Sequence, residues 1–253
     1  MYDNVELNRP TGIPGNDAIP DTNPQNRALN AVATIYRGII AALALYSAFI
    51  MLRNGWNDGS WDGLLDQALY FTTLSVIAVG VVYLGLTIMG LSTGFEKIEG
   101  RRASARGLAV LMSVMTGIIF AALLDGTYPD IQGLLAHLVV PILVAVDWLL
   151  VGRNQERVPW VMVGAWTLIL SLYLGAYYWD ATRGGRYGGP MYDFFDPSKG
   201  NFLMWLGIMY AAFILCAILL IAIGRLRGAI RGSGEGATGV AAEVSTRDMS
   251  EPA

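Results

Sequence analysis

The stretch Gly133-Leu-Leu-Ala-His-Leu-Val-Val-Pro-Ile-Leu-Val-Ala-Val-Asp-Trp148 decides the fold class of this chain. Between its ends it is almost entirely Leu, Val, Ile and Ala, which is typical of a helix that crosses a membrane. His137, Pro141 and Asp147 interrupt this run, and such residues are costly inside a membrane. Pro141 has no N–H for the carbonyl of His137, so we expect a bend and a free acceptor at the histidine. The stretch therefore predicts a membrane helix that carries candidates for function.

The composition of the whole chain extends this interpretation. The 253 residues are 54% hydrophobic and only 15% charged, and the mean hydropathy is +0.47. Such a chain is too apolar for an ordinary soluble domain. The apolar runs predict an all-α bundle of six transmembrane helices, at residues 28–52, 64–91, 107–124, 131–151, 158–179 and 202–223. Residues 1–27 and 225–253 are expected to form a flexible polar N-terminal tail and a disordered C-terminal tail.

The placement of Lys and Arg predicts the orientation of these spans. Six spans leave both termini on one side of the membrane. That side would carry eleven basic residues near the spans, namely Arg27, Arg37, Lys97, Arg101, Arg102, Arg106, Arg153, Arg157, Arg225, Arg227 and Arg231. The other side would carry four, namely Arg53, Arg183, Arg186 and Lys199. By the positive-inside rule both termini are expected to be cytoplasmic. Aromatic residues gather at the outer end, either as an interfacial belt or as the mouth of a site for an amphipathic ligand.

Several classes of site are excluded by residue counts. The chain has one cysteine, Cys216, and one histidine, so it has neither an intramolecular disulfide, nor a cysteine metal site, nor a bis-histidine haem site. Neither Lys97 nor Lys199 lies in an apolar run, which argues against a retinal Schiff base. No basic footprint for nucleic acid is present, and no cofactor or metal is predicted.

A hydroxyl and an imidazole are expected at similar depth near the outer side. Span two contains Tyr70-Phe71-Thr72-Thr73-Leu74-Ser75, and both this span and span four descend from the outer side. Thr72 and His137 could therefore meet, with Ser75 on the same helix face as Thr72. A threonine becomes a nucleophile when a base takes its proton, and histidine is the usual base at neutral pH.

Plainer roles stay open for the same residues. A threonine in a membrane helix commonly bonds its own backbone, and His137 could be a structural hydrogen-bonding residue. Asp147 lies ten residues beyond His137, so we expect a polar contact near the cytoplasmic end instead of an orienting role. Among Asp130, Asp62 and Asp66, the sequence does not select a carboxylate to orient the histidine.

The six spans, the segment Tyr70 to Ser75, His137-Leu-Val-Val-Pro141 and Asp147-Trp148 together resemble a family. They are similar to the androgen-induced integral membrane proteins, which include the androgen-dependent regulator of tissue factor pathway inhibitor. The resemblance implies a bacterial relative in the cytoplasmic (inner) membrane. It also implies an intramembrane threonine hydrolase of branched fatty-acid esters of hydroxy fatty acids, with Thr72 as nucleophile, Thr73 as the alternative, and His137 as base.

The leading hypothesis is therefore a membrane-embedded hydrolase of a lipid ester that enters from the outer leaflet. Thr72 and His137 are the expected catalytic residues, with possible support from Thr73, Ser75, Asp130 and Pro141. The alternative is a non-enzymatic lipid-binding protein, or an accessory or scaffold subunit of a membrane complex whose protein partners the sequence does not identify. A small transporter is less favoured, because neither repeat symmetry nor several midplane charges are evident.

Overall fold

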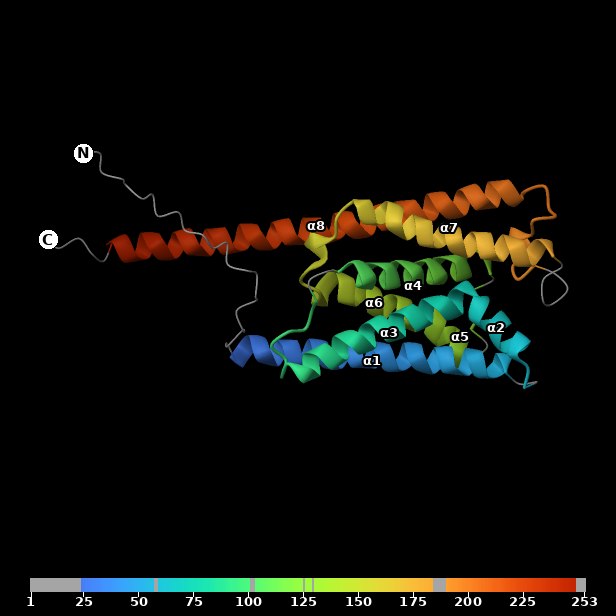
Figure 1. Cartoon of the computed structure of the whole chain (residues 1–253). Coiled ribbons are helices and arrows are strands. Elements are labelled where there is room, and N and C mark those ends of the chain that lie inside the picture. Colours follow the sequence, from blue (N-terminus) through green and yellow to red (C-terminus); the bar gives the residue numbers. More distant parts are fainter. Residues whose placement is uncertain are drawn as a thin grey trace, which may run out of the picture.

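All regular structure in the described part of the chain is helical. The computed structural model describes residues 24–56, 59–100, 103–124, 126–128, 130–183 and 190–248, with side chains up to residue 230. Six helices are long and apolar enough to cross a membrane, namely Gln25–Gly55, Phe71–Ser92, Ser104–Leu123, Ile131–Val151, Val161–Thr182 and Phe202–Ile230. The predicted all-α bundle of six transmembrane helices is thus confirmed (Figure 1).

Five crossings are continuous helices and one is interrupted. The continuous ones are α1 (Pro24–Gly55), α3 (Phe71–Ser92), α4 (Ser104–Leu123), α7 (Val161–Thr182) and α8 (Phe202–Asp248). The fourth crossing consists of α5 (Ile131–Leu134), the π-helical η1 (Leu135–Val139), α6 (Val140–Val146) and the π-helical η2 (Asp147–Val151). The 3₁₀ turns η3 (Gln155–Arg157) and η4 (Asp193–Phe195) lie in connections.

The second predicted span, residues 64–91, is two helices in the structure. A short helix, α2 (Trp61–Leu69), begins at Ser60, whose side chain accepts the N–H of Gly63. Tyr70 then adopts an extended conformation with ψ 134°, which ends α2 and starts α3 at Phe71. The break leaves the N–H of Phe71 free to donate to the hydroxyl of Tyr192, at 3.2 Å. The break at Tyr70 places Thr72 in the first turn of a helix.

Helix α8 runs past residue 225, where the sequence predicts a disordered tail, and continues to Asp248. Contacts with η2 and with the connection between η2 and α7 accompany its first additional turns. Arg225 donates to the carbonyl of Val158 at 3.2 Å, and Arg227 donates to that of Trp148 at 2.8 Å. The predicted N-terminal tail lies outside the described residues up to residue 23, as do Arg101, Arg102, Arg186 and residues 249–253. The side chain of Arg231 also lies outside the described part.

The bundle is held together by close packing of small and apolar residues. Helix α1 lies along α3, and Ala41, Ala44 and Ala48 are buried on the α1 face. On α3, a Cβ at Gly80 would overlap the side chain of Leu45, so this contact requires a glycine. Figure 1 shows α1 and α3 along one side, α7 and α8 along the other, and α4 and α6 between them.

The outer surface of the bundle is apolar. Large aliphatic side chains point outward from most of the crossings; Leu203, for example, is 75% exposed, and Leu172 and Leu150 are similar. In a water-soluble protein such a surface would be a liability, whereas lipid covers it at no cost. This surface fits a protein whose spans face a bilayer.

Candidate active site

The structure brings Thr72 and His137 together. Thr72 is the second residue of α3 and His137 is the central residue of η1. The Thr72 Oγ1 and His137 Nε2 atoms lie 3.2 Å apart, in a partly buried position. This is hydrogen-bond distance, and it is the arrangement in which an imidazole can take a proton from a hydroxyl.

The other ring nitrogen of His137 determines which atom carries the proton. Nδ1 lies 2.9 Å from the carbonyl oxygen of Gly133, one helical turn earlier. A carbonyl can only accept a hydrogen bond, so Nδ1 must be the donor. In the neutral ring Nε2 then has a free lone pair, and the Thr72 hydroxyl donates to it. The backbone therefore holds His137 in the tautomer that a general base toward Thr72 requires.

The local helix geometry around His137 follows from Pro141. The π-turn of η1 is closed by the Val140 N–H, which donates to the carbonyl of Leu135, and Pro141 follows near the start of α6. Such π-turns are rare and occur frequently at functional sites. The His137 carbonyl, which cannot bond Pro141, faces Gly117 of α4, where a Cβ would come within 3.0 Å of it. The expected irregularity at the histidine is thus a widened turn, and a glycine accommodates it.

Of the possible supporting residues, Ser75 contacts the backbone of Thr72, whereas Thr73 points away from Thr72 and His137. The Ser75 hydroxyl donates to the carbonyl of Thr72 at 2.8 Å and accepts from Thr116 at 3.0 Å, so it supports the backbone of the nucleophile candidate. The buried hydroxyl of Thr73 instead contacts Met51 Sδ at 3.7 Å and Gln67 at 3.4 Å. Thr73 therefore faces α1 and α2, and not the imidazole.

Asp130 contacts the same residue, Gly133, whose carbonyl holds the histidine. Its carboxylate caps α5 by accepting the Gly133 N–H at 2.6 Å, while the carbonyl of Gly133 accepts from His137. The group that orients the imidazole is thus a backbone carbonyl, which the sequence analysis did not consider. A glycine four residues before a histidine is compatible with this contact, but it is too common a pattern to identify it.

An aromatic pocket adjoins the pair. Thr72 and His137 both line it, together with rings from α7 and the segment that precedes α8, including Tyr173, Tyr177 and Phe195. Its cavity volume is about 40 Å³. Burial raises the pKa of Tyr192, another wall residue, to about 12, so its hydroxyl stays protonated and accepts from the Phe71 N–H.

His137 is also a wall of a second, polar chamber. This chamber has a cavity volume of about 340 Å³ and lies among α2, α5 and the C-terminal ends of α1 and α4. Its polar lining consists of Asn54, Gln67, Thr127, Asp130 and Gln132. Phe120 also lines it and stacks on the imidazole, with ring centroids 3.9 Å apart. The imidazole therefore separates an apolar space from a polar one.

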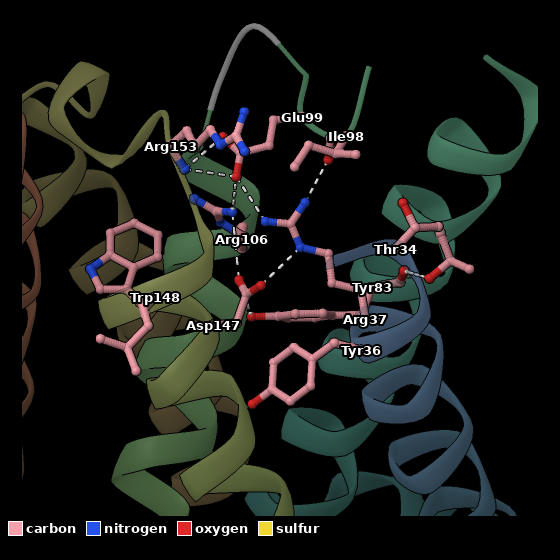
Figure 2. A network of polar contacts seen from close by, with 12 residues as sticks. Thr34, Tyr36, Arg37, Tyr83, Ile98, Glu99, Arg106, Asp147, Trp148 and Arg153 are labelled. Carbon is pink, nitrogen blue, oxygen red and sulfur yellow. Dashed lines mark hydrogen bonds and ion pairs between the residues drawn. The ribbon is translucent and has the colours of Figure 1, made fainter. Parts of the chain in front are cut away.

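Asp147 belongs to a different group of residues, near the other end of the bundle (Figure 2). Its carboxylate binds Arg37 at 2.8 Å, accepts from the Tyr83 hydroxyl at 3.1 Å and lies 3.5 Å from Arg106. Glu99 bridges the same two arginines, at 2.7 Å from Arg37 and 2.6 Å from Arg106. We call Arg37, Tyr83, Glu99, Arg106 and Asp147 the charge cluster.

The charge cluster confirms that Asp147 makes a polar contact instead of orienting the histidine. It also corrects the use of Arg37 and Arg106 as simple markers of orientation, because both are buried with acidic partners. The signal in the sequence was Arg37 itself, which lies well inside an apolar run. An arginine in one span and an aspartate in another are opposite charges that can pair inside a bundle.

Among the described residues, no group of His, Cys, Asp and Glu could hold a metal ion. The arrangement of the site thus offers a hydroxyl, an oriented base and two spaces of different polarity. No protein-family model matches this chain, and neither a curated protein nor a solved structure matches it.

Proposed function

We propose that this protein is a membrane-embedded hydrolase of lipid esters, in which Thr72 is the nucleophile and His137 the general base. The observation that supports this most strongly is the pair of contacts of the imidazole. Nε2 faces the Thr72 hydroxyl at 3.2 Å while Nδ1 donates to the Gly133 carbonyl at 2.9 Å. A base held by one nitrogen and directed at a hydroxyl by the other is the arrangement of nucleophilic hydrolases on unrelated folds.

The first half of the reaction forms an acyl-threonine. Thr72 Oγ1 attacks the ester carbonyl carbon, and its proton passes to Nε2 of His137. The oxyanion then collapses, the bond to the alcohol oxygen breaks, and the imidazolium gives its proton to the departing alcohol. Thr72 lies in the first turn of α3, where helix geometry leaves its N–H and that of Thr73 without intrahelical acceptors. The positive end of α3 therefore favours the oxyanion.

The substrate class follows from the polarity of the site and from its surroundings. The aromatic pocket next to Thr72 suits an acyl chain, so we take the substrate to be a fatty-acid ester, the broader class that the resemblance implies. With the termini cytoplasmic, the pair faces the outer leaflet of what we infer to be a bacterial inner membrane, so the ester enters from that leaflet.

A fluorophosphonate probe, which reacts with activated hydroxyl nucleophiles, tests the assignment. We expect labelling to disappear in Thr72→Ala and to fall by about 100-fold or more in His137→Ala, the scale of general base catalysis. Thr73→Ala is the matched control and should label like the parent protein, because the Thr73 hydroxyl faces Met51. Labelling that survives Thr72→Ala or is unaffected by His137→Ala would sink the proposal.

The second candidate is a lipid-binding or accessory subunit, and the aromatic lining of the pocket supports it as well. An apolar pocket with a few hydroxyl groups and one imidazole can hold a lipid without cleaving it. In that case the purified protein labels with no probe, carries an intact lipid, and releases it unchanged on denaturation. Mass spectrometry of the extracted lipid distinguishes the two candidates, since the hydrolase releases the free acid.

A further inference from the structure

The two spaces beside His137 differ in chemistry and share little besides that residue. The aromatic pocket is lined almost wholly by apolar side chains, and Thr72 opens onto it. The polar chamber on the other side has a larger volume, about 340 Å³ against about 40 Å³, and holds several waters, since each occupies roughly 30 Å³ in the liquid. Leu124 is the other residue that lines both spaces.

The polar groups of the chamber are arranged to face a hydrated space. Asn54 Nδ2 donates to Gln132 Oε1 at 3.2 Å, and Gln67 Nε2 donates to Thr73 Oγ1 at 3.4 Å. Each of these amides has further donors or acceptors that water can satisfy. Among the described residues that line the chamber there is no Lys or Arg, whereas the Asp130 carboxylate is one of them. The chamber is thus suited to water and uncharged hydroxyl groups and repels anions.

We propose that the polar chamber is the acceptor side of the site, meaning the side from which water reaches His137. The alcohol product, which carries hydroxyl groups but no charge, leaves through the same chamber. This inference rests on the proposed hydrolase function and adds the orientation of the substrate. It departs from the resemblance in the alcohol part of the ester, because a hydroxy fatty acid would leave as an anion. The acyl chain occupies the aromatic pocket, and the alcohol part of the ester points past the imidazole into the chamber. The hydrolytic water then comes from the side that the acyl chain does not fill.

The second half of the reaction balances in this arrangement. A water molecule from the chamber attacks the carbonyl carbon of acyl-Thr72, and its proton passes to His137 Nε2. The oxyanion collapses, the bond between the carbonyl carbon and Thr72 Oγ1 breaks, and the imidazolium returns the proton to Oγ1. The products are a free fatty acid and the original threonine, with the base again neutral.

Cysteine accessibility tests the water-filled chamber without reference to hydrolysis. In a Cys216→Ala background in lipid nanodiscs, Met51→Cys and Leu170→Cys form a matched pair. Both residues are buried, but Met51 lines the chamber and Leu170 the aromatic pocket. A positively charged methanethiosulfonate reagent should modify Met51→Cys at least about tenfold faster. Equal rates, or faster modification of Leu170→Cys, would overturn the assignment of the chamber.

Blocking the chamber tests its role in turnover. Thr127 lies at the exposed rim of the chamber, so the thiol of Thr127→Cys can be modified with a bulky, charged, thiol-reactive reagent. Modification should lower turnover of a 4-nitrophenyl acyl ester by about tenfold or more, while the rate of fluorophosphonate labelling changes by less than about twofold. The same modification of Asn201→Cys, an exposed site outside both spaces, is the control. If turnover is unchanged, the acceptor side lies elsewhere, and if labelling is lost as well, the ester itself enters through the chamber.

The preference for an uncharged alcohol has its own measurement. With the same acyl chain, a glycerol ester should turn over at least about tenfold faster than the corresponding glycerol-phosphate ester, and equal rates would contradict the preference. Absence of labelling in the unmodified protein would instead refute the hydrolase function. The accessibility of Met51→Cys would then still show whether the chamber holds water.

Discussion

Arg37 and Asp147 form a fully buried ion pair between the first and the fourth crossing. Their Nε and Oδ1 atoms lie 2.8 Å apart, and neither side chain is exposed. Arg37 also donates to the carbonyl of Ile98 at 2.6 Å and to Glu99. The pair therefore fixes α1, the loop before α4 and η2 relative to one another at the end opposite the candidate active site.

Breaking this pair on one side should destabilise the bundle. Arg37→Met or Asp147→Asn leaves an uncompensated charge among buried groups, which costs about 3–5 kcal/mol in other proteins. The thermal midpoint in detergent should fall strongly for each single variant and recover in part in Arg37→Met/Asp147→Leu. Asp193→Asn, which breaks the exposed pair with Lys199, is the control and should cost about 0–1 kcal/mol. Single variants as stable as this control would contradict the prediction.

Glu99 gives the stability of the charge cluster a dependence on pH. Burial alone would raise the pKa of Glu99, but the charges of Arg106 and Arg37 and the hydrogen bonds from Arg37 and the Arg153 N–H hold it below its ordinary value of 4.5. A depressed folded pKa means that Glu99 contributes stability above pH 4.5, which is lost as the pH falls through the folded pKa. Thermal midpoints should therefore drop below pH 4.5, and Glu99→Gln should show a smaller drop. Parallel profiles for the two proteins would refute this role of Glu99.

The sequence predicted well how deep each residue lies along its membrane helix. It predicted less well which side chains of neighbouring helices contact each other. Thr72 and His137 were expected in one layer because residue number along an apolar run measures depth, at 1.5 Å per residue. Which side chains then meet depends on helix rotation and packing. The choice between Thr72 and Thr73, the Gly133 carbonyl as orienting group and the partners of Asp147 could therefore only come from the structure.

The break at Tyr70 was missed for a related reason. The run from residue 64 to 91 is predominantly apolar apart from Asp66 and Gln67, and it contains no proline or glycine pair that predicts an interruption. The break coincides with a tertiary contact, the hydrogen bond from the Phe71 N–H to the hydroxyl of Tyr192, 121 residues away. A local pattern does not contain such a contact, and yet the contact helps to place Thr72 in the first turn of α3.

The role of His137 as general base predicts how the rate of fluorophosphonate labelling depends on pH. Only the neutral imidazole has a free lone pair on Nε2, so the rate of fluorophosphonate labelling should fall as the pH drops through the folded pKa of His137. The decrease should approach tenfold per pH unit on the acid side. The profile should be measured where the thermal midpoint is constant, so that the acid loss of the charge cluster does not contribute. A flat profile in this range would exclude His137 as the base.

The contact between Gly117 and the His137 carbonyl predicts that a residue on α4, outside the reactive pair, controls the geometry of Thr72 and His137. A Cβ at Gly117 would lie 3.0 Å from the His137 oxygen and 3.3 Å from Pro141 Cβ, so a larger side chain must displace η1. Shifts of about 1 Å in a catalytic group can cost about 100-fold in rate. Gly117→Val should therefore reduce fluorophosphonate labelling by about 10-fold or more, although residue 117 touches no hydroxyl nucleophile. Gly164→Val on α7 is the matched control, because a Cβ there meets no neighbouring atom within 4 Å. Both substitutions change the intrinsic helix propensity by the same amount, so equal labelling of the two variants would show that the position of η1 does not limit the pair.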